Sequence, residues 1–296
     1  MENWRFFKGS FENIEQIGDI DNNPEWEHIN LPHTWNMVDG EDGGSDYYRG
    51  DGWYYKKFNV PDSFLNKQVF IEFLGANSVS DVYINGTWLG QHKGGYTAFR
   101  YDITKYIYFN KENVLLVKVS NKHDPTVIPQ SGDFTFFGGI YRDVTLIACE
   151  KVHVDLLDYG SSGLYIIPEK VTRELAYVTV CSTIHNDSDI DKQIDIQIKL
   201  KEPDAFTTNA YEDRYFSGLP LRFNKEHMGN GTVVIDDKVS VSIKAGETYH
   251  YKKSFTVQRP HLWDGLNDPF RYETVLNRYE GNQKLDDVMQ YVGFRY

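Results

Sequence analysis

The acidic residues are the first candidates for chemistry in this 296-residue sequence, which holds 43 Asp and Glu. Hydrolysis of a glycosidic bond needs two carboxyl groups that face one sugar across about 5 to 9 Å. No pair of carboxylates stands out by its spacing, and the sequence has no GxSxG, HExxH or phosphate-cradling glycine motif. The sequence therefore predicts no catalytic residue, no metal site and no cofactor.

Aromatic residues gather beside arginine and aspartate in three short clusters. The clusters cover residues 31–36 with 47–55, 94–99 with 101–104, and 131–144. Aromatic rings can stack on the C–H faces of sugars, while charged groups hydrogen-bond to the hydroxyls. In a β-sandwich the same rings would be core residues, and the glycines would mark bulges or corners. Composition alone leaves both interpretations open.

The elements that would position these clusters are short β-strands. Apolar and polar residues alternate in short runs separated by turn signals, a rhythm typical of a sandwich or barrel. Asn85-Gly86 between two apolar runs is the strongest hairpin signal, because both turn positions favour a positive φ. Strands are predicted over residues 53–60, 69–74, 81–84, 87–90, 113–120 and 142–147.

A second series of strands begins after about residue 150. Residues 192–200 alternate strictly, which places Ile194, Ile196, Ile198 and Leu200 on one face. Further strands are predicted over residues 152–157, 177–184, 239–243, 249–257, 271–278 and 288–292. The stretch from Pro203 to Gly231 breaks the rhythm and is predicted to be a long insertion. The fold class is all-β, and short strands at this density indicate an immunoglobulin-like sandwich in the second half.

Charge and hydropathy exclude two classes of partner. The net charge is −12, whereas binding to nucleic acid needs a basic face that neutralises phosphates. No apolar run approaches the roughly 18 residues that span a bilayer, so no membrane partner is expected. The first residues enter folded sequence without a signal peptide, which predicts a cytoplasmic protein, or a periplasmic or secreted one if a signal peptide was removed. Homo-oligomerisation stays open.

Several motifs together resemble, in order, the sugar-binding jelly-roll domain of the family two glycoside hydrolases. These motifs are His33-Thr34-Trp35, Gly52-Trp53-Tyr54, Ile84-Asn85-Gly86, Gly94-Gly95-Tyr96-Thr97 and Gly139-Ile140-Tyr141-Arg142-Asp143-Val144. The second half resembles the immunoglobulin-like domain of the same family, and closes with Pro260-His261-Leu262-Trp263 and Val292-Gly293-Phe294-Arg295. The resemblance implies a jelly-roll β-sandwich over residues 1–150 and an immunoglobulin-like β-sandwich over residues 151–296. A catalytic TIM barrel would follow in the same polypeptide.

The resemblance also implies that the catalytic residues lie on another domain. In the family both catalytic glutamates lie on the barrel, and no position of this sequence matches either. The chain is therefore expected to be inactive alone, as the non-catalytic portion of a retaining exo-β-glycosidase.

Residues 132–139 look like the corresponding loop of bacterial β-galactosidases, so a terminal β-galactoside is the expected substrate. A β-glucuronidase parent is one alternative, since Gly94-Gly95-Tyr96-Thr97 is common there too. A free-standing carbohydrate-binding module is another, and a structural or adhesive two-sandwich protein is a further possibility.

Two residues are candidates for substrate binding by resemblance. In family galactosidases and glucuronidases, an Asp nine residues before the Arg of the Gly-Ile-aromatic-Arg motif reaches the active site on the barrel and hydrogen-bonds sugar hydroxyls. Asp133 stands nine residues before Arg142 and is followed by Phe134. Galactosidases place an Asn just ahead of the aromatic strand, and here Arg49 occupies about that place. Arg142 itself is expected to make a structural ion pair or structural hydrogen bonds.

Overall fold

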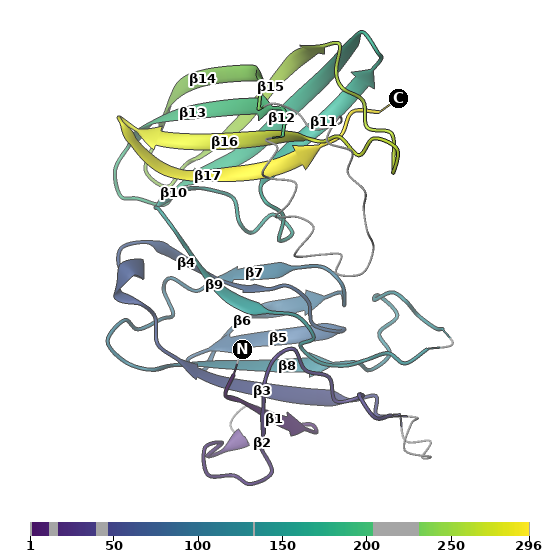
Figure 1. Cartoon of the computed structure of the whole chain (residues 1–296). Helices are drawn as coiled ribbons and strands as arrows, with labels where there is room; N and C mark the ends of the chain where they lie inside the picture. Colours follow the sequence, from purple (N-terminus) through teal and green to yellow (C-terminus); the bar gives the residue numbers. More distant parts are fainter. Residues whose placement is uncertain (1, 12–16, 40–46, 133, 204–230, 296) are drawn as a thin grey trace. The chain divides into compact units, whose positions relative to one another are not determined.

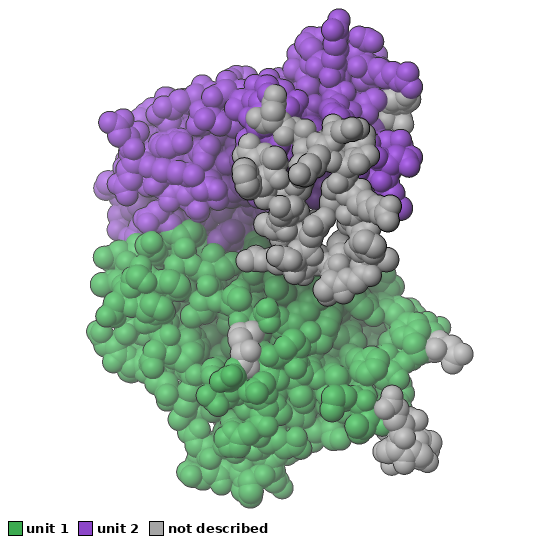
Figure 2. Space-filling view, viewed as in Figure 1, with its two compact units in different colours: residues 1–149 green, residues 150–296 purple. Residues whose placement is uncertain are grey.

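The structure is a computed structural model, which describes residues 2–11, 17–39, 47–132, 134–203 and 231–295. The chain divides into two compact units, Met1–Cys149 and Glu150–Tyr296 (Figure 2). Both units consist of β-strands and loops, which confirms the all-β fold class (Figure 1). No helix in these ranges is long and apolar enough to cross a membrane.

The first unit is a jelly-roll sandwich of two antiparallel sheets (Figure 1). The larger sheet has the order β2-β1-β3-β8-β5-β6, with bounds Glu27–Ile29, Trp4–Lys8, Asp51–Phe58, Asn113–Ser120, Val79–Ile84 and Thr87–Lys93. The smaller sheet has the order β7-β4-β9, with bounds Phe99–Asp102, Gln68–Phe73 and Val144–Cys149. One 3₁₀ turn, η2, covers Asp62–Phe64.

The larger sheet buries apolar residues on both of its faces. Its inner face contributes Val82 and Val117, each 0 % exposed, to the core between the sheets. Its outer face carries Trp53 and Tyr55, which pack against Trp26 in a second cluster. Burial on two faces explains why strict alternation of apolar and polar residues is weak in β1 and β3.

The β5–β6 hairpin turns where the sequence predicted it. Asn85 has a φ of 51° and Gly86 a φ of 83°, and two successive positive φ angles are what the favoured hairpin turn requires. The Asn85 carboxamide also fixes the turn, because it donates to the Tyr106 carbonyl oxygen at 2.6 Å and to Asn113 Oδ1 at 2.9 Å.

The second unit is an immunoglobulin-like sandwich, also antiparallel. One sheet consists of β10, β11, β12 and β15, with bounds Val152–Val154, Leu164–Val171, Leu175–Asn186 and Thr248–Gln258. The other has the order β14-β13-β16-β17, with bounds Val233–Ile243, Lys192–Lys201, Tyr272–Glu280 and Gln283–Val292.

The alternating pattern of β13 is confirmed, since Ile194, Ile196 and Ile198 are all fully buried. The predicted insertion lies almost entirely at residues 204–230, outside the described residues.

Candidate functional site

The first and third aromatic clusters meet at one end of the jelly-roll unit. The His33 N–H donates to the Ile140 carbonyl oxygen at 2.8 Å, and the Trp35 N–H donates to the Gly138 carbonyl oxygen at 3.3 Å. The Thr34 hydroxyl donates to the same Gly138 oxygen at 2.8 Å. A Cβ atom on Gly138 would lie 1.9 Å from the Trp35 ring. The two segments are therefore joined by backbone pairing and by a contact that only glycine allows.

Two buried asparagine side chains, Asn36 and Asn121, tie three loops together at this end. Both residues are 1 % exposed. The Asn121 amide donates to Asn36 Oδ1 at 3.2 Å and to the carbonyl oxygens of Tyr48 at 3.2 Å and Phe136 at 2.9 Å. Its Oδ1 accepts from the Gly50 N–H at 2.8 Å. Buried backbone groups need hydrogen-bond partners, and the Asn121 side chain supplies them to two loops.

Asn36 completes this network from the first cluster. Its Oδ1 accepts from the Gly138 N–H at 2.7 Å, and its amide donates to the Tyr48 carbonyl oxygen at 3.0 Å and to Asp39. Sequence reasoning gave neither asparagine a role. Asn121 directly follows a predicted strand, where an Asn is typical of a turn, and no sequence signal marks it as buried.

Arg49 lies on the loop that precedes β3, and its side chain packs against the loop that carries Phe136. Its guanidinium carbon is 4.5 Å from the centroid of the Phe136 ring and 5.9 Å from that of Tyr47. Its Nε donates to the Asn121 carbonyl oxygen at 2.8 Å. Within the described ranges, no acceptor pairs with either of its Nη groups. Its four Nη–H donors lie on a rigid, planar fork, the geometry that suits carboxylates and other paired acceptors.

Asp133, the other predicted substrate-binding residue, lies outside the described residues, so its role stays a prediction. Its neighbours along the chain are described. The rings of Phe134 and Phe136 are 4.9 Å apart, and Phe134 and Phe137 are 55 % and 48 % exposed. Exposed rings beside a guanidinium form a surface on which a sugar can stack and hydrogen-bond.

The second aromatic cluster is joined to the third by structural contacts. Arg142 Nη1 donates to the carbonyl oxygens of Leu74 and Tyr96 at 3.3 Å each, and the Tyr141 hydroxyl donates to that of Gly95. These bonds give Arg142 the structural role that its motif predicted.

Two titratable groups beside the first cluster, His33 and Tyr54, are buried and shifted toward their neutral forms. Burial lowers the pKa of His33 to about 4, and His33 Nδ1 lies 2.8 Å from the Tyr54 hydroxyl. Burial also raises the pKa of Tyr54. Both groups are therefore neutral at neutral pH, and neither is poised as a general acid or base.

The hollow beside Arg49 is too small to enclose a sugar. Arg49, Asn121 and Phe136 help to line it, and its volume is about 20 Å³, which is room for about one water molecule. Around Arg49 the described residues therefore form an open surface and no closed pocket. In the same ranges, no group of three or more His, Cys, Asp or Glu could hold a metal ion.

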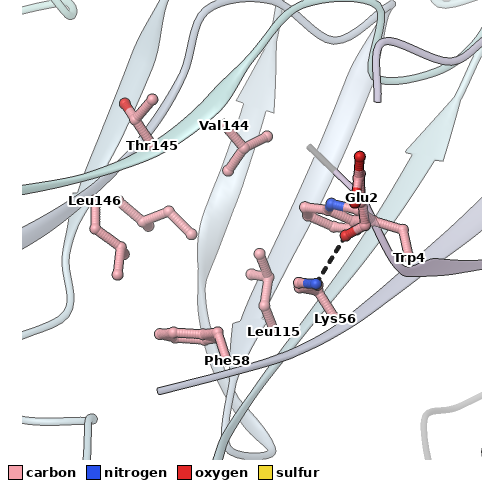
Figure 3. A pocket seen from close by; sticks show the side chains of 9 residues that line it. Glu2, Trp4, Lys56, Phe58, Leu115, Val144, Thr145 and Leu146 are labelled. Carbon is pink, nitrogen blue, oxygen red and sulfur yellow. Dashed lines mark hydrogen bonds between the residues drawn. The ribbon is translucent and has the colours of Figure 1, made fainter. Parts of the chain in front are cut away.

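A larger hollow of about 250 Å³ lies elsewhere in the unit, between β3 and β8 of one sheet and β9 of the other (Figure 3). Its apolar lining includes Trp4, Phe58, Leu115 and Leu146. At its rim the Lys56 ammonium is already occupied, since it donates to the Glu2 carbonyl oxygen at 2.8 Å. This lining offers few partners for sugar hydroxyls, so the hollow is distinct from the surface around Arg49.

The fold defines a class of protein: a jelly-roll sandwich followed by an immunoglobulin-like sandwich. Two family models match the chain. Residues 20–149 match the sugar binding domain of the glycosyl hydrolases family 2, and residues 162–295 match a second domain of the same family. Together the two matches cover most of the chain, which therefore belongs to glycosyl hydrolase family 2.

Relatives and solved structures agree with this assignment. A β-glucuronidase of Bacteroides fragilis is 32 % identical over 90 % of this chain and 34 % of its own length. A β-galactosidase of Bacteroides ovatus is 29 % identical over 99 % of this chain and 31 % of its own length.

The structure of a β-glucuronidase of Bacteroides uniformis, covalently bound to an aziridine, has a TM-score of 0.84 and 32 % identity, covering all of this chain and 32 % of that one. The chain thus spans about a third of the length of the relatives that it matches.

Proposed function

We propose that this chain forms the non-catalytic sandwich domains of a retaining exo-β-glycosidase, and that its jelly-roll unit lends one side of the sugar pocket. The observation that carries the proposal is the surface on the 131–138 loop, where the Arg49 guanidinium lies over Phe136 with its Nη groups turned to no acceptor among the described residues.

The chemical step belongs, in this proposal, to a TIM barrel of the same polypeptide. There one carboxyl group attacks the anomeric carbon and another protonates the leaving oxygen. Asp133 accepts hydrogen bonds from the hydroxyls of the terminal sugar, and the Arg49 guanidinium donates hydrogen bonds to the same sugar. Such bonds raise the rate to the extent that they strengthen in the transition state.

A terminal β-glucuronide is the substrate that Arg49 favours. A guanidinium fork pairs with a carboxylate through two charge-assisted hydrogen bonds, and the uronic acid is the sugar that carries one. The β-glucuronidases among the relatives support this choice. A β-galactoside, expected from the 132–139 loop, is the second candidate, and β-galactosidases also stand among the relatives.

The proposal is tested with the chain alone and with the gene product that extends beyond Tyr296 into a barrel. Release of 4-nitrophenol from its β-glucuronide and β-galactoside is measured for both proteins. We expect turnover by the longer protein and none by the chain alone. Turnover of neither substrate by the longer protein would overturn the proposal.

Calorimetric titration separates the remaining alternative, a free-standing carbohydrate-binding module. Galactose, lactose and glucuronic acid are titrated into the chain alone. Half of a pocket should give no measurable heat of binding, whereas a free-standing module would bind one of these sugars with a micromolar to millimolar Kd.

A further inference from the structure

A strip of the outer face of the larger sheet stays open to solvent, at the far end of β5 and β6 from the Arg49 surface. The cover over this face consists of Ile17, Ile20 and Trp26, which pack on Trp53 and Tyr55. Tyr83 on β5 packs at the margin of this cluster. Beyond it, on the edge strand β6, Trp88 is 56 % exposed. The other tryptophans are buried or half-buried, so Trp88 is the one tryptophan whose side chain is mostly exposed.

The register of the strands places aromatic and polar groups in two parallel rows. One row runs across three strands from Leu116 through Tyr83 to Trp88. The next row runs from Lys118 through Asp81 to Gln91, two residues along β8 and β5 and three along β6. The extra residue of β6 is taken up by a β-bulge, since the β5–β6 register shifts between Val82 and Tyr83. Side chains two residues apart on a strand point to the same face, so both rows share the outer face. Directly opposed side chains in each row start about 5 Å apart.

The polar row is hydrogen-bonded and nearly neutral. Gln91 Nε2 donates to Asp81 Oδ1 at 3.0 Å. The Lys118 ammonium lies 6.0 Å from the centroid of the Trp53 ring and 3.8 Å from Asp51. The strip therefore offers a carboxylate, a carboxamide and an ammonium beside two aromatic rings, with no excess of either charge.

This composition fits a polyol better than a second protein surface. The core of a protein interface is depleted of charged residues, whereas here Asp81 and Lys118 stand next to the rings. Sugars present C–H faces to aromatic rings and hydroxyl groups to donors and acceptors at their edges. We propose that the strip of Trp88, Tyr83, Asp81, Gln91 and Lys118 binds an extended, neutral polysaccharide chain, as a second carbohydrate site separate from the Arg49 surface.

The size of the strip predicts the length of carbohydrate that it binds. Two rows and three strands extend about 10 Å by 7 Å, which is roughly the length of two linked sugar rings. A single sugar should therefore bind too weakly to detect, and a longer chain should bind more tightly than its monomer. The site involves no catalytic step, so its presence or absence is independent of the proposed glycosidase activity.

Native gel electrophoresis of this chain through gels that contain polysaccharide tests the proposal. The probes are β-1,4-galactan, xylan, glucomannan and hydroxyethyl cellulose, with polygalacturonate as an acidic comparison. We expect at least one neutral probe to retard the chain. Trp88→Ala should weaken that binding about tenfold or more, the effect typical of a central aromatic contact. Retardation by none of the neutral probes would overturn the proposal.

Three controls separate binding from other effects of the substitution. Trp88→Phe keeps a ring and should retain part of the retardation. Tyr159→Ala removes a side chain that is 93 % exposed in the other unit and should change nothing. The melting temperature of Trp88→Ala should match that of the unaltered chain within about 2 °C, because the residue is mostly exposed.

The competing occupant of the strip is a second copy of the chain. Size-exclusion chromatography with light scattering measures this for the unaltered chain and for Trp88→Ala. If the unaltered chain is a dimer and Trp88→Ala is a monomer, the strip mediates self-association and the proposal is overturned. Equal retardation of Trp88→Ala and the unaltered chain would overturn it as well.

Discussion

The carboxamides of Asn36 and Asn121 are hydrogen-bonded to each other at 3.2 Å although 85 residues separate them in the sequence. Each of them also bonds to the backbone of the loops that carry Arg49 and Phe136. Amides suit this task because each supplies two donors and an acceptor in fixed geometry. The proposed sugar surface is therefore supported by a buried polar network.

Asn121→Ala should destabilise the jelly-roll unit by about 2 to 4 kcal/mol. The substitution leaves the Gly50 N–H and the Phe136 carbonyl oxygen without their partner in a buried place. Urea unfolding of this chain measures the loss. Asn110→Ala, which alters an exposed asparagine, is the matched control and should stay within about 0.5 kcal/mol. Equal stability of the two variants would contradict the role given to Asn121.

Gly138→Ala should also destabilise the jelly-roll unit, in this case through a steric clash. Its added methyl group would overlap the Trp35 ring at 1.9 Å, and forcing a core side chain aside costs about 1 to 3 kcal/mol. Gly246→Ala is the control, because nothing lies within 4 Å of the added atom and only the positive φ of 72° is unfavourable, at a cost of about 1 kcal/mol. In thermal unfolding, the melting temperature should fall more for Gly138→Ala than for Gly246→Ala. The reverse order would exclude the steric contact between an added methyl group and Trp35.

His33 should make the stability of the unit depend on pH between about 4 and 6.5. Its pKa in the folded chain is about 4, below its ordinary value, so the unfolded chain binds the proton more readily in this range. Stability that is complete above pH 6.5 is therefore lost as the pH falls, by at most about 3 kcal/mol. Melting curves of His33→Gln should show a smaller loss across this range than the unaltered chain, while His123→Gln, at an exposed histidine, should keep the full loss. Parallel curves for all three proteins would show that His33 is not the responsible group.

Arg49→Gln should change the choice between the two candidate sugars in the longer enzyme. Loss of the guanidinium removes a carboxylate partner, so kcat/KM for the β-glucuronide should fall about tenfold or more. The value for the β-galactoside should change by less than about threefold. Lys105→Gln, at an exposed cation of the same unit, should alter neither. A fall of equal size for both substrates would mean that Arg49 does not select the uronic acid.

Local patterns in the sequence predicted the strands that follow simple rules. Asn85-Gly86 marked its hairpin because backbone chirality restricts the turn to such residues, and Ile194, Ile196 and Ile198 marked β13 because only one of its faces is buried. The strand β1 escaped detection for the opposite reason. Phe6 packs inward and Phe7 packs in the outer cluster, so apolar residues at adjacent positions hide the alternation.

The candidate site was predictable only in part. Motif order pointed to Arg49 and to the segments around it, and the structure brings Arg49 against Phe136. The support beneath them was not predictable, because Asn121 owes its burial to loops that lie far away along the chain. The pairing of Trp88 with Tyr83 follows from the two-residue turn at Asn85-Gly86. The exposure of Trp88 was not predictable, because it depends on how far the cover of the outer face extends.

The central claim is that this chain lends substrate contacts to a catalytic site that it does not itself contain, and Asp133→Asn in the longer enzyme tests it most directly. The measurement is kcat/KM for the preferred 4-nitrophenyl glycoside, with Asp62→Asn, at an exposed carboxylate of the same unit, as control. We predict a loss of about a hundredfold for Asp133→Asn, none for Asp62→Asn, and a melting temperature of this chain unchanged within about 2 °C. A kcat/KM for Asp133→Asn within twofold of the unaltered enzyme would contradict the account.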